Sequence, residues 1–163
     1  MSDQQGSQAF VGASDFRVRY DAFIAGLHIQ GIRISDADIK APHPYGSEPH
    51  RQLEGRVATS NNYANMQGGF FARSTLAFDG VYADEEQPRV SIKVTVEVGY
   101  LAAVPMSDDI FEVFGIRNLP LNTWPYLREF VQSALVRAGW PVYTLPAFKP
   151  APLQLQLNLP SGT

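Results

Sequence analysis

The clearest pattern in the chain is a two-residue alternation over residues 89–104, RVSIKVTVEVGYLAAV. Every second position from Val90 to Val98 is β-branched, and the positions between them are polar or charged. Successive side chains of a strand point to opposite faces of a sheet. The pattern therefore predicts an antiparallel strand with the valines and Ile92 on a core face and one wet face. The wet face would carry Ser91, Lys93, Thr95 and Glu97.

Other segments complete a predicted β-rich half. Residues 69–78, GFFARSTLAF, predict a second strand, and the turn-rich residues 79–88 suit a hairpin into the first. Residues 28–39, HIQGIRISDADI, switch to period two with β-branched isoleucines. Four further stretches are less regular. Residues 53–60 predict a short edge strand, residues 41–52 and 61–69 predict loops, and residues 109–115 predict a strand or a bridge into a helix.

An N-terminal helix is predicted from Ser14. Phe16, Tyr20, Phe23, Ile24 and Leu27 follow the i, i+4, i+7, i+8, i+11 spacing of one helical face. Ser14 suits the N-cap, and Gly26 suits the stop. The alternation of Phe16, Val18 and Tyr20 would also fit a strand, but the longer helical spacing is preferred. Residues 1–13 are expected to form a flexible tail.

The strongest helix signal lies near the C-terminus. Asn122 or Thr123 is the expected N-cap, Pro125 suits the first turn, and Gly139 follows the last turn. Most apolar residues of this helix fall on one core-facing arc: Trp124, Leu127, Phe130, Val131, Ala134, Leu135 and Ala138. Tyr126 and Val136 lie off that arc, which is typical of a subunit interface or of ordinary scattered surface residues.

An apolar, proline-punctuated segment follows this helix: WPVYTLPAFKPAPLQLQLNLP. It is too rich in proline for a helix and too broken for a central strand. We therefore expect an extended segment that lies over the domain. Its large side chains, Trp140, Tyr143, Leu145 and Phe148, either complete the core or form the walls of a groove, and the residues alone leave both interpretations open.

Composition narrows the class of protein. The chain has 163 residues, of which 45% are hydrophobic and 18% charged, and this favours one globular domain. The net charge of −3 gives no excess of positive charge for binding nucleic acid. Cysteine is absent, which excludes disulfides and fits a reducing cytosol. No apolar run approaches a membrane span, and the polar start MSDQQGSQ lacks an export signal. A cytoplasmic protein that does not insert into membranes is predicted.

Candidate catalytic chemistry is weak. His43, Glu48 and His50 could in principle hold a metal, but their spacing matches no ligand frame. His28 is expected to be structural. The carboxylate pairs Asp36–Asp38 and Asp108–Asp109 lack a partner base and suit a solvated face. Nucleotide-binding loops and nucleophile motifs are not found. We therefore expect neither an enzyme nor a bound metal or cofactor.

Three segments resemble the SecB family of export chaperones. Residues 123–148, TWPYLREFVQSALVRAGWPVYTLPAF, match its aromatic-Pro-Tyr-x-Arg-Glu helix start, here Trp124 to Glu129, and the proline and apolar linker that follow the helix. Residues 29–44 resemble its first strand with an Asp-x-x-x-x-Ala-Pro ending, at Asp36 and Ala41-Pro42. Residues 94–101, VTVEVGYL, resemble its acid-bearing central strand, with the acid at Glu97.

The resemblance implies an α+β subunit in which a long C-terminal helix covers a four-stranded antiparallel sheet. This domain would span residues 14–150, before a proline-rich tail at 151–163. The resemblance also implies a homotetramer, built as a dimer of dimers, that holds unfolded or precursor polypeptides without ATP. It assigns the client-binding groove, an acidic partner-binding face at Asp36 and Glu97, and an oligomer interface at Tyr126 and Val136. The groove would contain Trp124, Trp140, Tyr143, Leu145 and Phe148.

The chain also departs from the family pattern. Lys40 stands where an acidic residue is expected, which should weaken docking to the SecA motor. The C-terminus, QLQLNLPSGT, has neither the second helix nor a metal-binding tail, and the N-terminal helix is an addition. These traits are closer to SecB-like chaperones that accompany toxin–antitoxin pairs or stand alone. Export through SecA, protection of an antitoxin, and a non-chaperone interaction module of the same fold all remain open.

Overall fold

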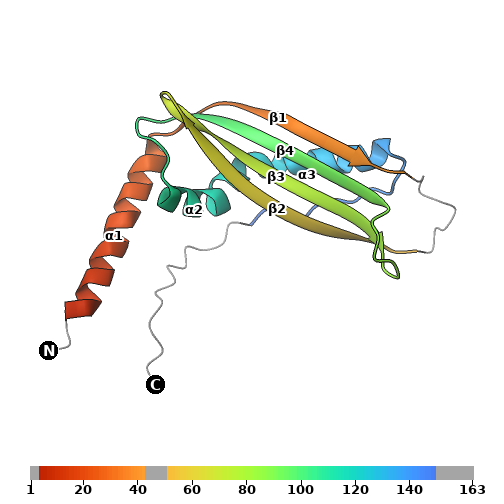
Figure 1. Ribbon diagram of the computed structural model, residues 1–163, viewed down its shortest axis with the longest axis horizontal. Helices are drawn as coiled ribbons and strands as arrows, with labels where there is room; N and C mark the ends of the chain where they lie inside the picture. Colours follow the sequence, from red (N-terminus) through yellow and green to blue (C-terminus); the bar gives the residue numbers. More distant parts are fainter. Residues whose placement is uncertain (1–3, 43–50, 150–163) are drawn as a thin grey trace, which may run out of the picture.

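The computed structural model describes residues 4–42 and 51–149, with the side chains of 4–11 and 13 left out. The first half runs from helix α1 through strands β1, β2 and β3, and the second half continues through β4 to helices α2 and α3 (Figure 1). Their bounds are α1 Gln4–Ala25, β1 His28–Lys40, β2 Leu53–Met66, β3 Gly69–Tyr82, β4 Val90–Leu101, α2 Asp108–Arg117 and α3 Leu119–Arg137.

The four strands form one antiparallel sheet in the order β1-β4-β3-β2. Two hairpins join β2 to β3 and β3 to β4, and β1 and β2 lie at opposite edges of the sheet. In the tight β2–β3 turn, Gly68 has a φ of 78°, a conformation that glycine adopts without strain. The central strands β3 and β4 carry the core, whereas β1 and β2 are largely exposed edge strands.

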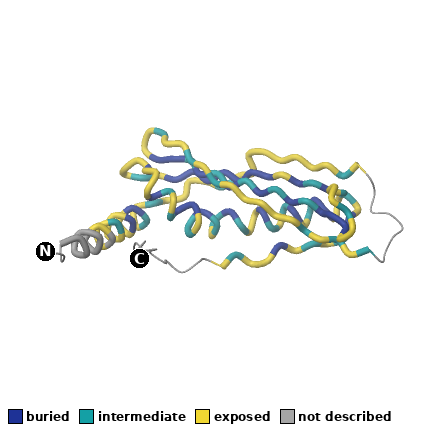
Figure 2. Tube along the Cα trace, turned by 60° about the horizontal axis from the view of Figure 1, so that its bottom comes forward, coloured by how far each residue is buried: buried dark blue, intermediate teal, exposed yellow. Residues whose placement is uncertain are grey.

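One face of the sheet is covered by α3, and Figure 2 shows burial concentrated in the central strands and along α3. The predicted core face of β4 is confirmed, because all five of its alternating residues from Val90 to Val98 are buried. The core between the sheet and α3 includes Leu76, Phe78, Ile92, Val94, Val96, Leu127, Val131 and Leu135. The α+β architecture expected from the sequence, with its N-terminal helix, four-stranded sheet and long C-terminal helix, is confirmed.

Three predicted elements differ in extent or type. The strand β2 continues to Met66, through residues expected to form a loop, because its whole length pairs with β3. Residues 108–117 form helix α2, so of the two alternatives left open for 109–115, a strand or a bridge into the helix, the strand is wrong. Helix α2 carries two aspartates in its first turn and Arg117 in its last, which complements the helix dipole. Its apolar residues Ile110 and Phe114, four positions apart, are buried together.

Both long helices begin earlier than the sequence indicated. Helix α1 starts at Gln4, so residues 4–13 lie in this helix and do not form the expected tail. Helix α3 starts at Leu119 after Asn118, and the proline of its first turn is Pro120, whereas Pro125, predicted for that place, lies inside the helix. The predicted caps lie inside it: Asn122 Nδ2 donates to the Tyr100 hydroxyl at 2.8 Å, and Thr123 Oγ1 to the Leu119 carbonyl at 3.1 Å.

The end of α3 follows the prediction closely. Gly139 has a φ of 74°, and its N–H donates to the Val136 carbonyl at 3.1 Å. The Trp140 N–H donates to the Leu135 carbonyl at 2.9 Å. This pair of bonds is the Schellman motif that closes many helices at a glycine, and an apolar contact commonly accompanies it. Here Trp140 and Leu135 belong to the same core, so the helix end turns the chain back toward the sheet.

Some predicted features lie outside the described residues. These are residues 1–3 of the N-terminal tail, the proline-rich tail at 151–163, and the His43, Glu48 and His50 cluster. Within residues 4–42 and 51–149, His, Asp and Glu side chains do not gather in groups suited to a metal ion. In the same ranges, the helices are too short or too polar to cross a membrane.

Candidate functional site

The segment after α3, Trp140–Lys149, is called the linker below. It leaves the C-terminal end of α3 and runs back along the subunit (Figure 2). Two of its residues close the core: Trp140 is 5% exposed, with its ring centroid 6.2 Å from that of Tyr82, and Leu145 is fully buried. Neither side chain is available at the surface as a groove wall in this conformation. They anchor the linker to the subunit.

Tyr143 lies between these anchors and is only partly buried. Its ring packs on Phe78 of β3, with centroids 5.1 Å apart. The ring also lies over Gly55 of β2, where an added Cβ would come within 2.5 Å of Tyr143 Cζ. Glycine at position 55 therefore makes room for the tyrosine and lets the linker lie close to the sheet.

The far end of the linker is fixed to the first half of α3. Trp124 Nε1 donates a hydrogen bond to the Pro146 carbonyl at 2.8 Å. The Trp124 and Phe148 rings contact each other, with centroids 6.3 Å apart, and both side chains are half-buried. These two aromatic residues, both assigned to the groove from the sequence, therefore lie together and leave apolar surface open to solvent.

The open apolar residues of this region define what we call the linker surface: Val57, Trp124, Val142, Tyr143 and Phe148. Val142 is 60% exposed and Val57 of β2 is 42% exposed. Val57 lies two residues from Gly55, on the same face of β2 and close to Tyr143. Sequence reasoning missed Val57 and Val142, because an isolated valine in a strand or loop gives no signal of exposure.

Strand β2 adds backbone hydrogen-bonding groups beside the linker surface. It is an edge strand, paired with β3 on one side only in the described part of the chain. An unpaired strand edge is a template for an additional strand. Asn61 Nδ2 donates to the Gly115 carbonyl at 2.7 Å, and the Tyr63 hydroxyl donates to Asp108, so one half of β2 is held against α2. The half nearer Leu53 lies beside the linker.

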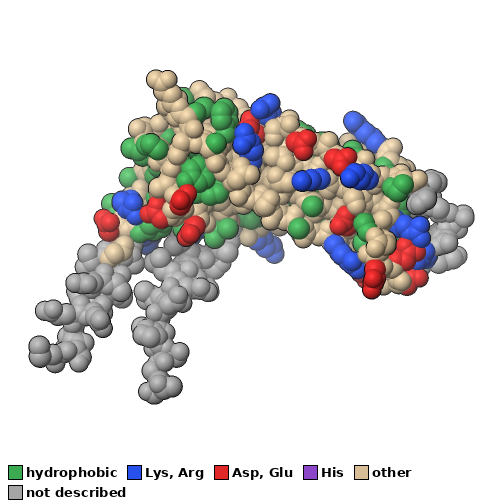
Figure 3. Space-filling view, viewed as in Figure 1, with side chains coloured by type: hydrophobic (Ala, Val, Ile, Leu, Met, Phe, Trp, Pro, Cys, Tyr) green, Lys and Arg blue, Asp and Glu red, His purple; other side chains and the backbone are tan. Residues whose placement is uncertain are grey.

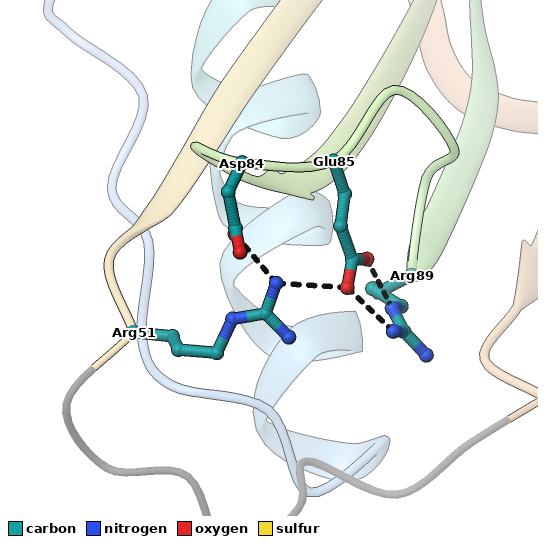
Figure 4. A network of polar contacts seen from close by, with 4 residues as sticks. All are labelled: Arg51, Asp84, Glu85 and Arg89. Atoms are coloured by element: carbon teal, nitrogen blue, oxygen red, sulfur yellow. Dashed lines mark hydrogen bonds and ion pairs between the residues drawn. The ribbon is translucent and has the colours of Figure 1, made fainter.

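A charged cluster holds the end of the sheet where the linker begins. Arg51 donates to Asp84 and to Glu85, the second at 2.8 Å, and Arg89 donates to Glu85 at 2.5 Å (Figure 4). The hydrogen bonds from Arg89 and then Arg51 lower the pKa of Glu85 to about 2. The Arg51 guanidinium also lies 4.1 Å from the centre of the Tyr82 ring, which contacts Trp140.

The opposite face of the sheet, turned away from α3, carries the two residues predicted for an acidic partner-binding face. Asp36 is exposed and pairs in register with Thr95, two residues before Glu97. Glu97 is only 4% exposed, because Arg33 and Arg73 each donate to it at 2.7 Å. Burial alone would raise the pKa of Glu97, but these hydrogen bonds outweigh it and the net shift is downward.

This face therefore carries charges of both signs, as Figure 3 shows. Lys40 lies 3.3 Å from Asp38, and Arg33 and Arg73 neutralise Glu97. The face of β4 predicted to be solvent-exposed is only partly exposed, because Thr95 is 9% exposed and hydrogen-bonds to Thr75 at 2.8 Å. The face holds Asp36 and Glu97 on one side of the sheet without forming a continuous acidic patch.

The residues predicted for an oligomer interface are exposed on the subunit. Tyr126 and Val136 on α3 are 43% and 53% exposed. Strand β1 adds a second apolar strip that the sequence did not indicate as exposed. Ile29, Ile34 and Ile39 pair with the buried Tyr100, Val96 and Ile92, yet remain open because β1 is an edge strand at the margin of α3.

Comparison with known proteins places the fold. No protein-family model matches the sequence, and neither does a curated protein. The structure of the Mycobacterium tuberculosis Rv1957 SecB-like chaperone, in complex with a ChAD peptide from the HigA1 antitoxin, matches with a TM-score of 0.66. That match has 14% sequence identity and covers 80% of this chain and 97% of the other.

A second solved structure, a Streptococcus agalactiae protein of unknown function, matches with a TM-score of 0.41 at 13% identity over 74% of this chain and 97% of the other. The match to the M. tuberculosis protein agrees with the α+β architecture described above. The fold of this chain is that of a SecB-like chaperone.

Proposed function

We propose that this protein is an ATP-independent chaperone that binds unfolded or precursor polypeptides at the linker surface and the edge of β2. The observation that carries the proposal is the open set of aromatic and aliphatic side chains beside an unpaired strand edge on a SecB-like fold. Fold alone does not define function, so the proposal rests on this surface.

The physical basis is sequence-tolerant binding. Removing one large apolar side chain from water stabilises a complex by about 1.5–3 kcal/mol. An extended client would also gain backbone hydrogen bonds by adding a strand to β2, which depend little on its sequence. Within the groove predicted from sequence, Trp124, Tyr143 and Phe148 keep the role of client contacts. Trp140 and Leu145 take the role of anchors that position them.

Clients of two kinds remain candidates. The M. tuberculosis SecB-like protein of the same fold was solved with an antitoxin peptide, and this favours an antitoxin as a client here. Delivery to SecA through an acidic face receives less support, because Lys40, Arg33 and Arg73 offset the acidic residues of the outer face. Either role suits a cytoplasmic protein.

We further propose that subunits associate into a dimer or a dimer of dimers. Tyr126 and Val136 provide one exposed apolar surface on α3, and Ile29, Ile34 and Ile39 provide another on the edge strand β1. An exposed apolar edge strand is a surface that native proteins usually cover. Association would leave the β2 edge free, because β1 and β2 lie at opposite edges of the sheet.

Light scattering tests the proposal. A chemically denatured client protein is diluted into buffer without nucleotide, alone or with this protein at increasing ratio. We expect aggregation to be suppressed near stoichiometric amounts, and Val142→Ser to weaken the suppression. Val18→Ser is the matched control, because Val18 is 68% exposed on α1 and lies outside the linker surface. Absence of suppression by the parent protein, or equal effects of both substitutions, would contradict the proposal.

A further inference from the structure

A separate cavity lies where the C-terminal half of α1 meets the α2–α3 junction, and it shares no residue with the linker surface. Its volume is about 510 Å³, within the range of pockets that bind small molecules. Most of its wall is apolar and comes from one side of α1. The lining residues are Phe16, Arg17, Tyr20, Asp21, Ile24, Ala25, Arg117 and Asn118.

The wall of this cavity is a built structure. Tyr20 is 6% exposed, and its hydroxyl donates to Asn118 Oδ1 at 2.5 Å. Burial raises the pKa of Tyr20 to about 12 although the Arg117 charge opposes the shift, so this hydroxyl is neutral at physiological pH. On the neighbouring side of α1, Arg19 donates to Asp109 of α2 at 2.8 Å and ties the two helices together.

Arg117 is the chemically unusual member of the lining. Its Nη1 is shielded from solvent and has no hydrogen-bond partner among the described residues. Two acceptors of this region are engaged by other donors: Asn118 Oδ1 accepts from Tyr20, and Asp109 accepts from Arg19. A shielded donor without an acceptor is costly, and more so when it belongs to a charged group. A ligand that brings a hydrogen-bond acceptor into the cavity would therefore satisfy Arg117 Nη1.

The charge of the lining selects the ligand class. Arg17 and Asp21 form an ion pair at 3.8 Å, which leaves Arg117 as the uncompensated charge. A ligand with one negative charge would balance Arg117, whereas a phosphate would bring excess negative charge that Asp21 repels. The planar guanidinium matches the two oxygens of a carboxylate, and the apolar wall suits a short aliphatic group.

From these observations we infer that the cavity binds a monocarboxylate carried on a short apolar group, with Arg117 holding the carboxylate and Phe16, Tyr20 and Ile24 contacting the apolar part. Two sources share this chemistry. One is a free aliphatic acid, and the other is the C-terminal carboxylate of a polypeptide that ends in apolar residues. The site goes beyond the proposed chaperone activity and does not depend on it.

Isothermal titration calorimetry on the full chain at neutral pH tests this site with two pairs of probes. Octanoate is compared with octanamide, and N-acetyl-Leu-Leu with its C-terminal amide. A hydrogen bond to a charged group corresponds to roughly ten- to a hundred-fold in affinity, and we expect the acid of at least one pair to be preferred by this factor. Preference for octanoate alone identifies a free acid, and preference for the peptide acid alone identifies a chain terminus.

Two variants complete the experiment. Arg117→Gln should bring acid and amide to equal affinity. Arg137→Gln, at the C-terminal end of α3 and outside the cavity lining, should keep the parent's preference for the acid. Because Arg117 Nη1 is shielded and has no partner in the free protein, Arg117→Gln should not lower the melting temperature. The inference is overturned if neither acid binds the parent protein at millimolar concentration, or if acid and amide bind it equally. It is also overturned if Arg117→Gln still prefers the acid over the amide, or if this substitution markedly lowers the melting temperature.

Discussion

Substitution of Gly55 by alanine tests how closely the linker lies on the sheet. The new Cβ would lie 2.5 Å from Tyr143 Cζ and 2.8 Å from Phe78 Cε2. Tyr143 can swing outward only by giving up its contact with Phe78, and Phe78 is fully buried and cannot move freely. Overpacking of this kind typically costs about 1–3 kcal/mol, so we expect Gly55→Ala to lower the free energy of unfolding by roughly that amount.

The matched control is Gly31→Ala in β1. A Cβ at Gly31 meets no atom within 4 Å, so the same chemical change should be close to neutral there. Urea denaturation, followed by circular dichroism, measures the free energy of unfolding of both variants. The experiment is repeated in a Tyr143→Ala background, where removal of the ring should recover part of the cost of Gly55→Ala. Equal stability of the two glycine variants, or an unchanged cost without Tyr143, would refute the described position of the linker.

Three further predictions follow from the same contacts. Trp140→Ala should lower the free energy of unfolding by about 3–5 kcal/mol, and Trp124→Ala by clearly less, because Trp140 is buried and Trp124 is half-buried. Urea denaturation of the two variants measures both losses. Equal losses would be inconsistent with an anchoring role for Trp140. The folded-state pKa of Glu85 is about 2, below its ordinary 4.5, so its ion pairs stabilise the fold fully above pH 4.5 and are lost as the pH falls toward 2. Glu85→Gln should therefore flatten the decline of melting temperature over that acid range, and an unchanged decline would show that the pairs of Figure 4 do not contribute. Introducing a charge at an apolar subunit contact is costly, so Tyr126→Asp with Val136→Asp should reduce the native mass measured by light scattering; an unchanged mass would place the subunit contacts elsewhere.

Periodicity predicted the centre of the fold well. The valine alternation of β4 and the apolar arc of α3 are long, regular and buried, so local pattern and tertiary packing agree. Helix α2 was not recognised, and a strand was left open there, because its ten residues are too few to make a helical period distinct. The polar residues 61–66 in the second half of β2 gave no strand signal, because an exposed edge strand needs only backbone pairing with β3.

The candidate site was predictable in kind but not in detail. The apolar composition of the linker predicts a segment that covers the domain, and it does so. Which side chains face inward depends on the turn at Gly139 and on the contact of Tyr143 with Gly55, neither of which leaves a periodic signal. The neutralisation of Glu97 depends on Arg33 and Arg73 from neighbouring strands, which only the register brings together.

Hydrogen–deuterium exchange with and without an unfolded client tests the central claim most directly, because it reports which backbone segments a client covers. The account predicts slower exchange in peptides from β2, residues 53–66, and from the linker, residues 140–149, with peptides from α1 unchanged. Protection confined to the outer face of the sheet or to α1, or no protection by a client that is demonstrably bound, would contradict it.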